Sequence, residues 1–295
     1  MTPEWVTLVI ARWANFLSVA TLFGMALFQL YAPQGSRKTF AGSVAARRLF
    51  LAGGAIVFIS TIGWAGAVLV DLAGDVGALH DRNAWSSFLF DTSFGLVWLV
   101  RCTLATVLAI CAARGVRANA LIAALAACLL FSQSWIGHVA ALSAPARFGV
   151  ALAYAAHVLA AGAWLGGLTA LIVVLPIFRA RGDRMSASKL LTRFSTVGLV
   201  AVVAIIVGGM VNVVAQAHMA TLLTSGWGRT LGVKVLLVLA MLALASLNRL
   251  VLTPRLSTEG SSKLDAMIRS VALEQALGIA ALGLTAVLGI LDPAG

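Results

Sequence analysis

The chain has 295 residues, of which 61% are hydrophobic and only 11% are charged. A soluble domain has about a quarter of its residues charged, so this composition excludes a soluble enzyme. The net charge is +11. In so apolar a chain the positions of the basic residues report membrane orientation, so we expect contact with membrane lipid and not with nucleic acid.

Eight apolar runs are long enough to cross a bilayer as helices, which takes about 20 residues each. The runs cover residues 5–31, 49–70, 94–113, 118–135, 148–178, 194–217, 231–252 and 268–291. All six prolines are expected at or beyond the edges of these runs, where helices end. The runs predict an all-α polytopic membrane protein: a single eight-helix transmembrane domain over residues 1–295. The first run has no basic segment ahead of it, so we expect it to remain as a span rather than be cleaved as a signal peptide.

The basic residues are distributed unevenly between the turns. Fifteen of the 21 Lys and Arg follow the first, third, fifth and seventh runs. The positive-inside rule places these turns in the cytoplasm and both termini outside, an N-out/C-out topology in the bacterial inner membrane. Six of the ten acids then lie on the outer side, and so do the four histidines: His80, His138, His157 and His218.

His157 is the histidine predicted to lie deepest in the membrane. It is about nine residues into the run 148–178, or roughly 13 Å below the outer surface on a helix. Trp164 shares its helix face, while Gly162 and Gly166 form a GxxxG spacing typical of close helix packing. We interpret 148–178 as a central helix and His157 as a candidate metal ligand. The alternative is a histidine that only bonds to a neighbouring helix.

Other candidate ligands lie nearer the outer surface. Imidazole with thioether suits Cu(I), and imidazole with carboxylate suits Cu(II). The pattern predicts that outer groups, with help from Asp75 or Asp91, capture copper and pass it to His157. The candidate metal ligands are His80, His138, His157, Met210, His218 and Met219.

Charged residues inside the runs form a separate group. Arg12 and Arg101 are each about eight residues in from the outer end, and Asn15 is one turn from Arg12. A positive charge repels copper, so each arginine pairs with an acid, holds a carbonyl or attracts an anion. We expect structural pairing for both.

Glu274, in the cytoplasmic half of the last run, is a candidate proton or cation relay or the partner of a cytoplasmic arginine. No nucleotide-binding or HExxH motif is present, so no enzymatic activity is predicted.

Three stretches resemble the copper resistance protein D (CopD) family. They are Asp91-Thr-Ser-Phe-Gly-Leu-Val-Trp-Leu-Val-Arg101, His157-Val-Leu-Ala-Ala-Gly-Ala-Trp-Leu-Gly-Gly-Leu168, and the C-terminal part from about residue 190 to 295, with Gly228-Arg-Thr-Leu-Gly-Val-Lys234 and Leu247-Asn-Arg249. The resemblance implies an eight-span inner-membrane protein of copper uptake, often beside a periplasmic copper carrier of the CopC type. It marks as family positions His138, His157, Trp164, Arg101, Lys234, Asn248 and Glu274. Asn15 stands where this family's first span commonly has a histidine.

Two other functions remain open from the sequence. A b-type haem protein of electron transfer is one, because histidine is the ordinary axial ligand. The difference in depth between His157 and the surface histidines argues against a bis-histidine haem. A sensor or assembly partner that binds copper without moving it is the other.

Overall fold

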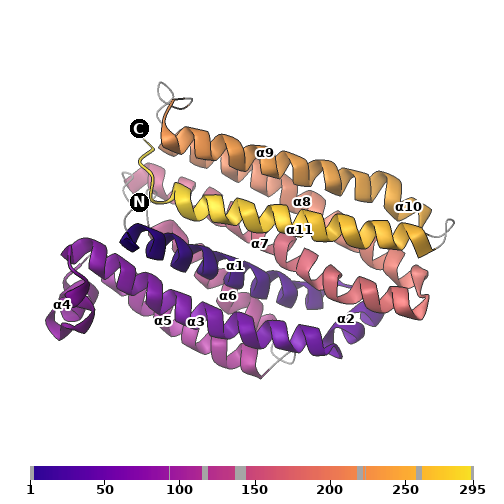
Figure 1. The fold of residues 1–295 in the computed structure, drawn as a ribbon, viewed down its shortest axis with the longest axis horizontal. Coiled ribbons are helices and arrows are strands. Elements are labelled where there is room, and N and C mark those ends of the chain that lie inside the picture. The colour runs from indigo at the N-terminus through magenta and orange to yellow at the C-terminus, as the bar shows by residue number, and fades with distance from the viewer. Residues whose placement is uncertain are drawn as a thin grey trace.

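We describe the protein from a computed structural model, which covers residues 3–92, 94–114, 119–136, 144–217, 222, 224–256 and 261–293. Its elements in the described ranges are helical (Figure 1). In chain order they are α1 (Pro3–Tyr31), α2 (Gln34–Ala41), α3 (Val44–Ala73), η1 (Val76–His80), α4 (Arg82–Ser86), η2 (Ser87–Asp91), α5 (Gly95–Ala113), α6 (Asn119–Ser132), η4 (Gln133–Trp135), α7 (Ala144–Arg181), α8 (Arg184–Gln216), α9 (Gly226–Leu247), η6 (Asn248–Leu252), α10 (Thr253–Arg255) and α11 (Ser261–Leu288).

Seven helices are long and apolar enough to cross a membrane: α1, α3, α5, α7, α8, α9 with its continuation through α10, and α11. The eighth predicted run, 118–135, forms the shorter apolar helix α6 and the turn η4. Both termini lie at the same end of the bundle in Figure 1, as an even number of crossings requires. The all-α, multi-pass architecture is therefore confirmed, while eight spans and the N-out/C-out orientation stay predictions.

Several helices extend beyond the apolar runs at the predicted cytoplasmic end. The sixth run begins at residue 194, but α8 begins at Arg184. Asp183 caps it, because its carboxylate accepts a 3.0 Å hydrogen bond from the backbone N–H of Ser186. Hydrogen bonds from Ser186 hold the pKa of Asp183 below its ordinary value.

The proline prediction is wrong for Pro176, which lies inside α7. Pro176 lacks the N–H that would bond to the carbonyl four residues earlier, and the helix continues for only five residues beyond it.

The long helix α7 is the centre of the bundle, as the sequence predicts. It packs against α1, α6, α8 and α11, and 67% of its apolar window is buried. On the face toward α1, Gly24 meets Gly162 and Gly166 of α7 so closely that a Cβ on Gly24 would lie 2.5 Å from the Cα of Gly166. The GxxxG spacing thus brings two helix backbones into contact.

The helices that follow α7 are much less covered by protein. Only 11% of the apolar window of α8 and 17% of that of α9 are buried. Their apolar outer faces are the surfaces that lipid covers in a membrane. In Figure 1, α9, α11 and α8 lie together along one side of α7, and α1, α3 and α5 lie along the other.

Candidate functional site

Glu274 is the centre of a buried polar cluster in the C-terminal half. Its side chain is 1% exposed. Trp164 of α7 donates its indole N–H to Oε1 at 2.6 Å, and Asn248 donates its amide to Oε2 at 3.2 Å. Asn248 begins η6, a π-helical turn that continues α9. Single π-turns inside helices recur at functional sites, because they redirect one side chain without ending the helix.

A cavity of about 150 Å³ adjoins this carboxylate, between α7, α8, α9 and α11. Most of its wall is apolar, and Arg249 lines it together with the polar residues Trp164, Asn248 and Glu274. Both groups that donate to Glu274 are neutral. The expected alternative for Glu274, an ion pair with a cytoplasmic arginine, is absent from the described residues: Arg249 donates to the carbonyl and hydroxyl of Ser195 instead, and Arg179 pairs with Asp265.

His157 is held by the neighbouring helix α8. Its Nδ1 is 2.7 Å from the backbone carbonyl of Ile205. A carbonyl only accepts, so Nδ1 carries the proton and Nε2 keeps a free lone pair. Gly208 and Gly209 form the notch that admits the ring, since a Cβ on Gly209 would lie 3.3 Å from Nδ1. The sequence left open whether His157 bonds to a neighbour or serves as a ligand, and the observed bond fits both, because metal-bound histidines commonly fix their other nitrogen in this way.

His157 and Trp164, the α7 partner of Glu274, lie on one face of α7. Trp164, which bonds to Glu274, is seven residues beyond His157 and therefore on the same helix face, roughly 10 Å deeper. Lys234 of α9 is close enough to His157 to act on it electrostatically. A line of polar side chains therefore leads from the imidazole of His157, through Trp164, to the carboxylate of Glu274.

The other predicted metal ligands do not join this line. His80 and Asp91 are exposed in the connection between α3 and α5, and so is Asp75, which accepts from the backbone N–H of Gly77 at 3.0 Å. Met210 is 63% exposed on the outer surface of α8. The predicted ligands outside the described residues are His138, His218 and Met219. Within the described residues no group of three or more His, Cys, Asp or Glu side chains is suited to a metal ion.

The haem alternative gains no support from the two described histidines. His80 is in η1, which packs against α3, whereas His157 packs against α8. These two elements lie in different parts of the bundle (Figure 1). The two imidazoles therefore do not face each other across a shared space, as the two axial ligands of one iron must.

Arg101 organises a second buried cluster, in the N-terminal half. Its side chain has no exposed area. One terminal nitrogen donates to the carbonyl of Leu129 at 3.1 Å and to the hydroxyl of Ser132 at 2.6 Å. The other donates to the amide oxygen of Asn15 at 3.1 Å. Structural pairing of Arg101, as expected from the sequence, is thus observed, with a carbonyl, a hydroxyl and an amide as its partners.

Asn15 connects α1, α3 and α5 through this cluster. Its amide nitrogen donates to the hydroxyls of Ser60 at 3.1 Å and Thr61 at 2.8 Å. Since its oxygen accepts from Arg101, Asn15 uses both ends of its side chain in helix-to-helix bonds. In this structure it acts as a positioning residue for the guanidinium.

Sequence reasoning missed the partner that Arg12 and Arg101 share. Their Cζ atoms lie 5.1 and 5.0 Å from the ring of Trp64, and Trp64 packs edge-on against Trp98. Cation–π contacts stabilise a guanidinium without an opposite charge. Trp64 lies in a run without charges, so no local pattern identifies it as the residue between two arginines.

These features define a helical multi-pass membrane protein with buried polar groups of opposite character in its two halves. The chain belongs to the copper resistance protein D family. Residues 1–148 match the copper resistance protein D-like N-terminal domain, and residues 188–288 match the copper resistance protein D domain. It is therefore a multi-pass protein of the inner membrane.

Three known relatives are similar to this chain in sequence. The inner membrane protein YebZ of Escherichia coli (strain K12) is 29% identical over 295 residues, which cover 98% of each chain. Copper resistance protein D of Pseudomonas syringae pv. tomato is 26% identical over 310 residues, 97% of this chain and 96% of that protein. The copper transport protein CutJ of Bacillus subtilis (strain 168) is 29% identical over 205 residues, 66% of this chain and 36% of that protein. No solved structure matches the chain.

Proposed function

We propose that this protein carries copper ions across the inner membrane, from the periplasm to the cytoplasm, through its C-terminal half. The family supports a role in copper transport. The observation that carries the route is the buried carboxylate of Glu274, which borders a cavity and has only neutral hydrogen-bond donors. A carboxylate that is buried in a membrane protein without an opposite charge costs free energy, and it attracts a cation or a proton.

In this proposal His157 binds the ion and Glu274 relays charge below it. The Nε2 lone pair of His157 is a suitable ligand for either copper oxidation state. His80 and the acids Asp75 and Asp91 belong to the outer surface, where a single imidazole and separate carboxylates hold copper only weakly before it moves inward. A CopC-type carrier would deliver copper at this surface. The membrane potential drives inward movement by about 2.3 kcal/mol per charge per 100 mV.

Two substitutions at His157 test the route. Leucine and methionine have similar volumes, but only methionine offers a copper ligand. In cells that express equal amounts of each protein, we expect His157→Leu to lower copper accumulation about tenfold or more, an energy of about 1.4 kcal/mol. His157→Met should keep a clear part of the wild-type accumulation when copper is supplied as Cu(I).

The two variants separate a ligand from a packing residue. Both remove the bond to Ile205, so equal losses in both would mean that the imidazole only joins α7 to α8. Wild-type accumulation in both would contradict the proposed route. Thermal unfolding of the purified variants shows whether either loss comes from misfolding.

A further inference from the structure

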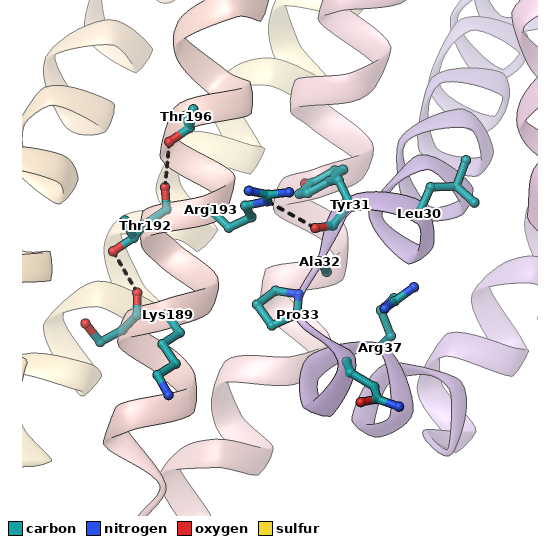
Figure 2. A pocket seen from close by; sticks show the side chains of 11 residues that line it. Leu30, Tyr31, Ala32, Pro33, Arg37, Lys189, Thr192, Arg193 and Thr196 are labelled. Atoms are coloured by element: carbon teal, nitrogen blue, oxygen red, sulfur yellow. Dashed lines mark hydrogen bonds between the residues drawn. The ribbon is translucent and has the colours of Figure 1, made fainter.

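We propose that the end of the bundle opposite the two chain termini carries a binding site for the headgroup of an anionic phospholipid. This site is separate from the copper route. A cavity of about 620 Å³ opens there between the end of α1, the start of α2 and the first turns of α8. Figure 2 shows Tyr31, Pro33 and Arg37 on one side of it and Lys189, Thr192 and Arg193 on the other.

The charge of the cavity selects an anion. Arg37, Lys189 and Arg193 line it, and none of its lining residues is acidic. Three positive charges repel a copper ion, which argues against a role as its exit. Arginine and lysine together are the usual partners of phosphate, because the guanidinium offers paired N–H donors and the ammonium a compact charge.

Two buried polar atoms of the cavity residues lack a partner. The Nε of Arg37 and the hydroxyl of Tyr31 are buried and form no hydrogen bond. Arg193 uses its Nε to donate to the backbone carbonyl of Tyr31 at 3.3 Å, which brings its guanidinium against the end of α1 (Figure 2). A phosphate group in the cavity would accept hydrogen bonds from the guanidinium and ammonium groups that line it.

The surroundings favour a lipid over a free phosphate ion. Leu30, which also lines the cavity, is 51% exposed. Along α8 the cavity residue Thr196 is followed on the same helix face by Val200, Val203 and Val207, which are 70%, 57% and 57% exposed. An apolar stripe therefore continues from the cavity along the membrane-spanning part of α8. A headgroup in the cavity would leave its acyl chain against this stripe, an arrangement known for basic pockets between membrane helices.

The test compares lipid binding to the full-length protein by native mass spectrometry, with phosphatidylglycerol and phosphatidylcholine of identical acyl chains. The cavity variant carries Arg37→Gln, Lys189→Gln and Arg193→Gln. The matched control carries Arg47→Gln, Arg48→Gln and Arg184→Gln, which removes the same charge from exposed positions at the same end. We expect the cavity variant to lose about tenfold or more in affinity for phosphatidylglycerol, and the control to stay within about twofold of wild type.

Three outcomes would overturn the proposal. Equal losses in both variants would mean that the general basic charge binds the lipid, and equal binding of both lipids would mean that net charge is not recognised. Complete displacement of phosphatidylglycerol by millimolar inorganic phosphate would make the site one for a free anion. If the triple variant does not fold, Arg37→Gln alone should still weaken phosphatidylglycerol binding several-fold relative to Arg47→Gln, and equal binding by these two would also overturn the proposal.

Discussion

The N-terminal and C-terminal halves bury polar groups of opposite charge. In the first, Arg12 and Arg101 lie against Trp64, and Arg101 also bonds to Asn15, with no carboxylate among these partners. In the second, Glu274 bonds to Trp164 and Asn248, with no cation among them. Both halves use an indole and a carboxamide to hold a buried charge.

The comparison shows that the same neutral side chains can serve two electrostatic purposes. An indole offers its π-face to a cation and its N–H to an anion. A carboxamide likewise offers an oxygen to Arg101 and a nitrogen to Glu274. The N-terminal half therefore buries guanidinium groups that repel a copper ion, and the C-terminal half buries a carboxylate that attracts one, with the cations Lys234 near His157 and Arg249 in the wall of the cavity beside Glu274.

Exchanging amide and acid at the two buried positions tests the difference between the halves most directly. We expect Glu274→Gln to lower copper accumulation about tenfold or more, because the carboxylate that attracts the cation is lost. Asn15→Asp should leave accumulation within about twofold of wild type. The hydroxyls of Ser60 and Thr61 can rotate to donate to the new carboxylate, so the fold should be kept. Copper content per cell, normalised to the amount of folded protein, gives the answer.

A carboxylate elsewhere on α11 provides the control. Asp265 lies near the start of that helix and pairs with Arg179 at the surface. Asp265→Asn should have little effect on accumulation. If Asn15→Asp abolished accumulation while its fold was intact, the ion would pass through the N-terminal half, and the division of roles would be wrong.

A second prediction concerns the contact that joins the halves. Gly24→Ala places a methyl group against the backbone of Gly162 and Gly166, which cannot move aside as a side chain can. We expect a loss of about 1–3 kcal/mol in the free energy of unfolding, measured by denaturant titration in detergent. Gly63→Ala on α3, where a Cβ would meet nothing within 4 Å, should cost nothing. Equal unfolding free energies for both variants would mean that the methyl group is accommodated at Gly24 and that the backbone contact does not control stability.

The smallest expected effect is at a helix cap. Asp183→Ala should cost about 1 kcal/mol in stability at pH 7, because the start of α8 loses its cap. The folded-state pKa of Asp183 is lowered, so the capping contribution is present above the unfolded pKa of about 3.9 and is lost as the pH falls through the folded value. Thermal midpoints of wild type and variant should therefore converge in acid.

The equivalent cap in the N-terminal half is the control. Asp81 accepts from the backbone N–H of Asn83 at 2.8 Å, at the start of the five-residue α4. Because α4 is short and lies outside the bundle, Asp81→Ala should cost less than about 0.5 kcal/mol. A larger loss of stability for Asp81→Ala than for Asp183→Ala would contradict the expectation that the cap of α8 contributes more to stability than the cap of α4.

The sequence predicted the fold well because the membrane sets the length of each span. Apolar runs identified the seven long helices and the shorter α6, with boundaries that differ by up to ten residues, and the spacing of Gly162 and Gly166 predicted the close packing of α7. Where a helix extends beyond its apolar run, as α8 does before residue 194, its length no longer follows from hydropathy. Pro176, which lies inside α7, likewise shows that a proline near the edge of an apolar run does not have to end the helix.

The site was only partly predictable, since its partners are distant in the chain. The depth of Glu274 and His157 followed from their positions in the runs. The bonds of Glu274 to Trp164 and Asn248 span 110 and 26 residues and depend on the packing of three helices. Met210 was expected near the ligands because it lies two turns below His218, but the helix turns its side chain to the outside.

The contact of Gly24 with Gly166 limits how this bundle can move. Because the two backbones touch there without intervening side chains, no side chain can change its rotamer to admit a shift, and we expect α1 and α7 to move as one unit. α8 is held to α7 in a similar way, since a Cβ on Gly208 would lie 2.5 Å from the backbone oxygen of Ala153, whereas only 17% of the apolar window of α9 is buried. In the proposed route, we therefore expect the opening that admits an ion to come from α9 moving against this unit, at a cost that depends on the thickness and fluidity of the surrounding membrane.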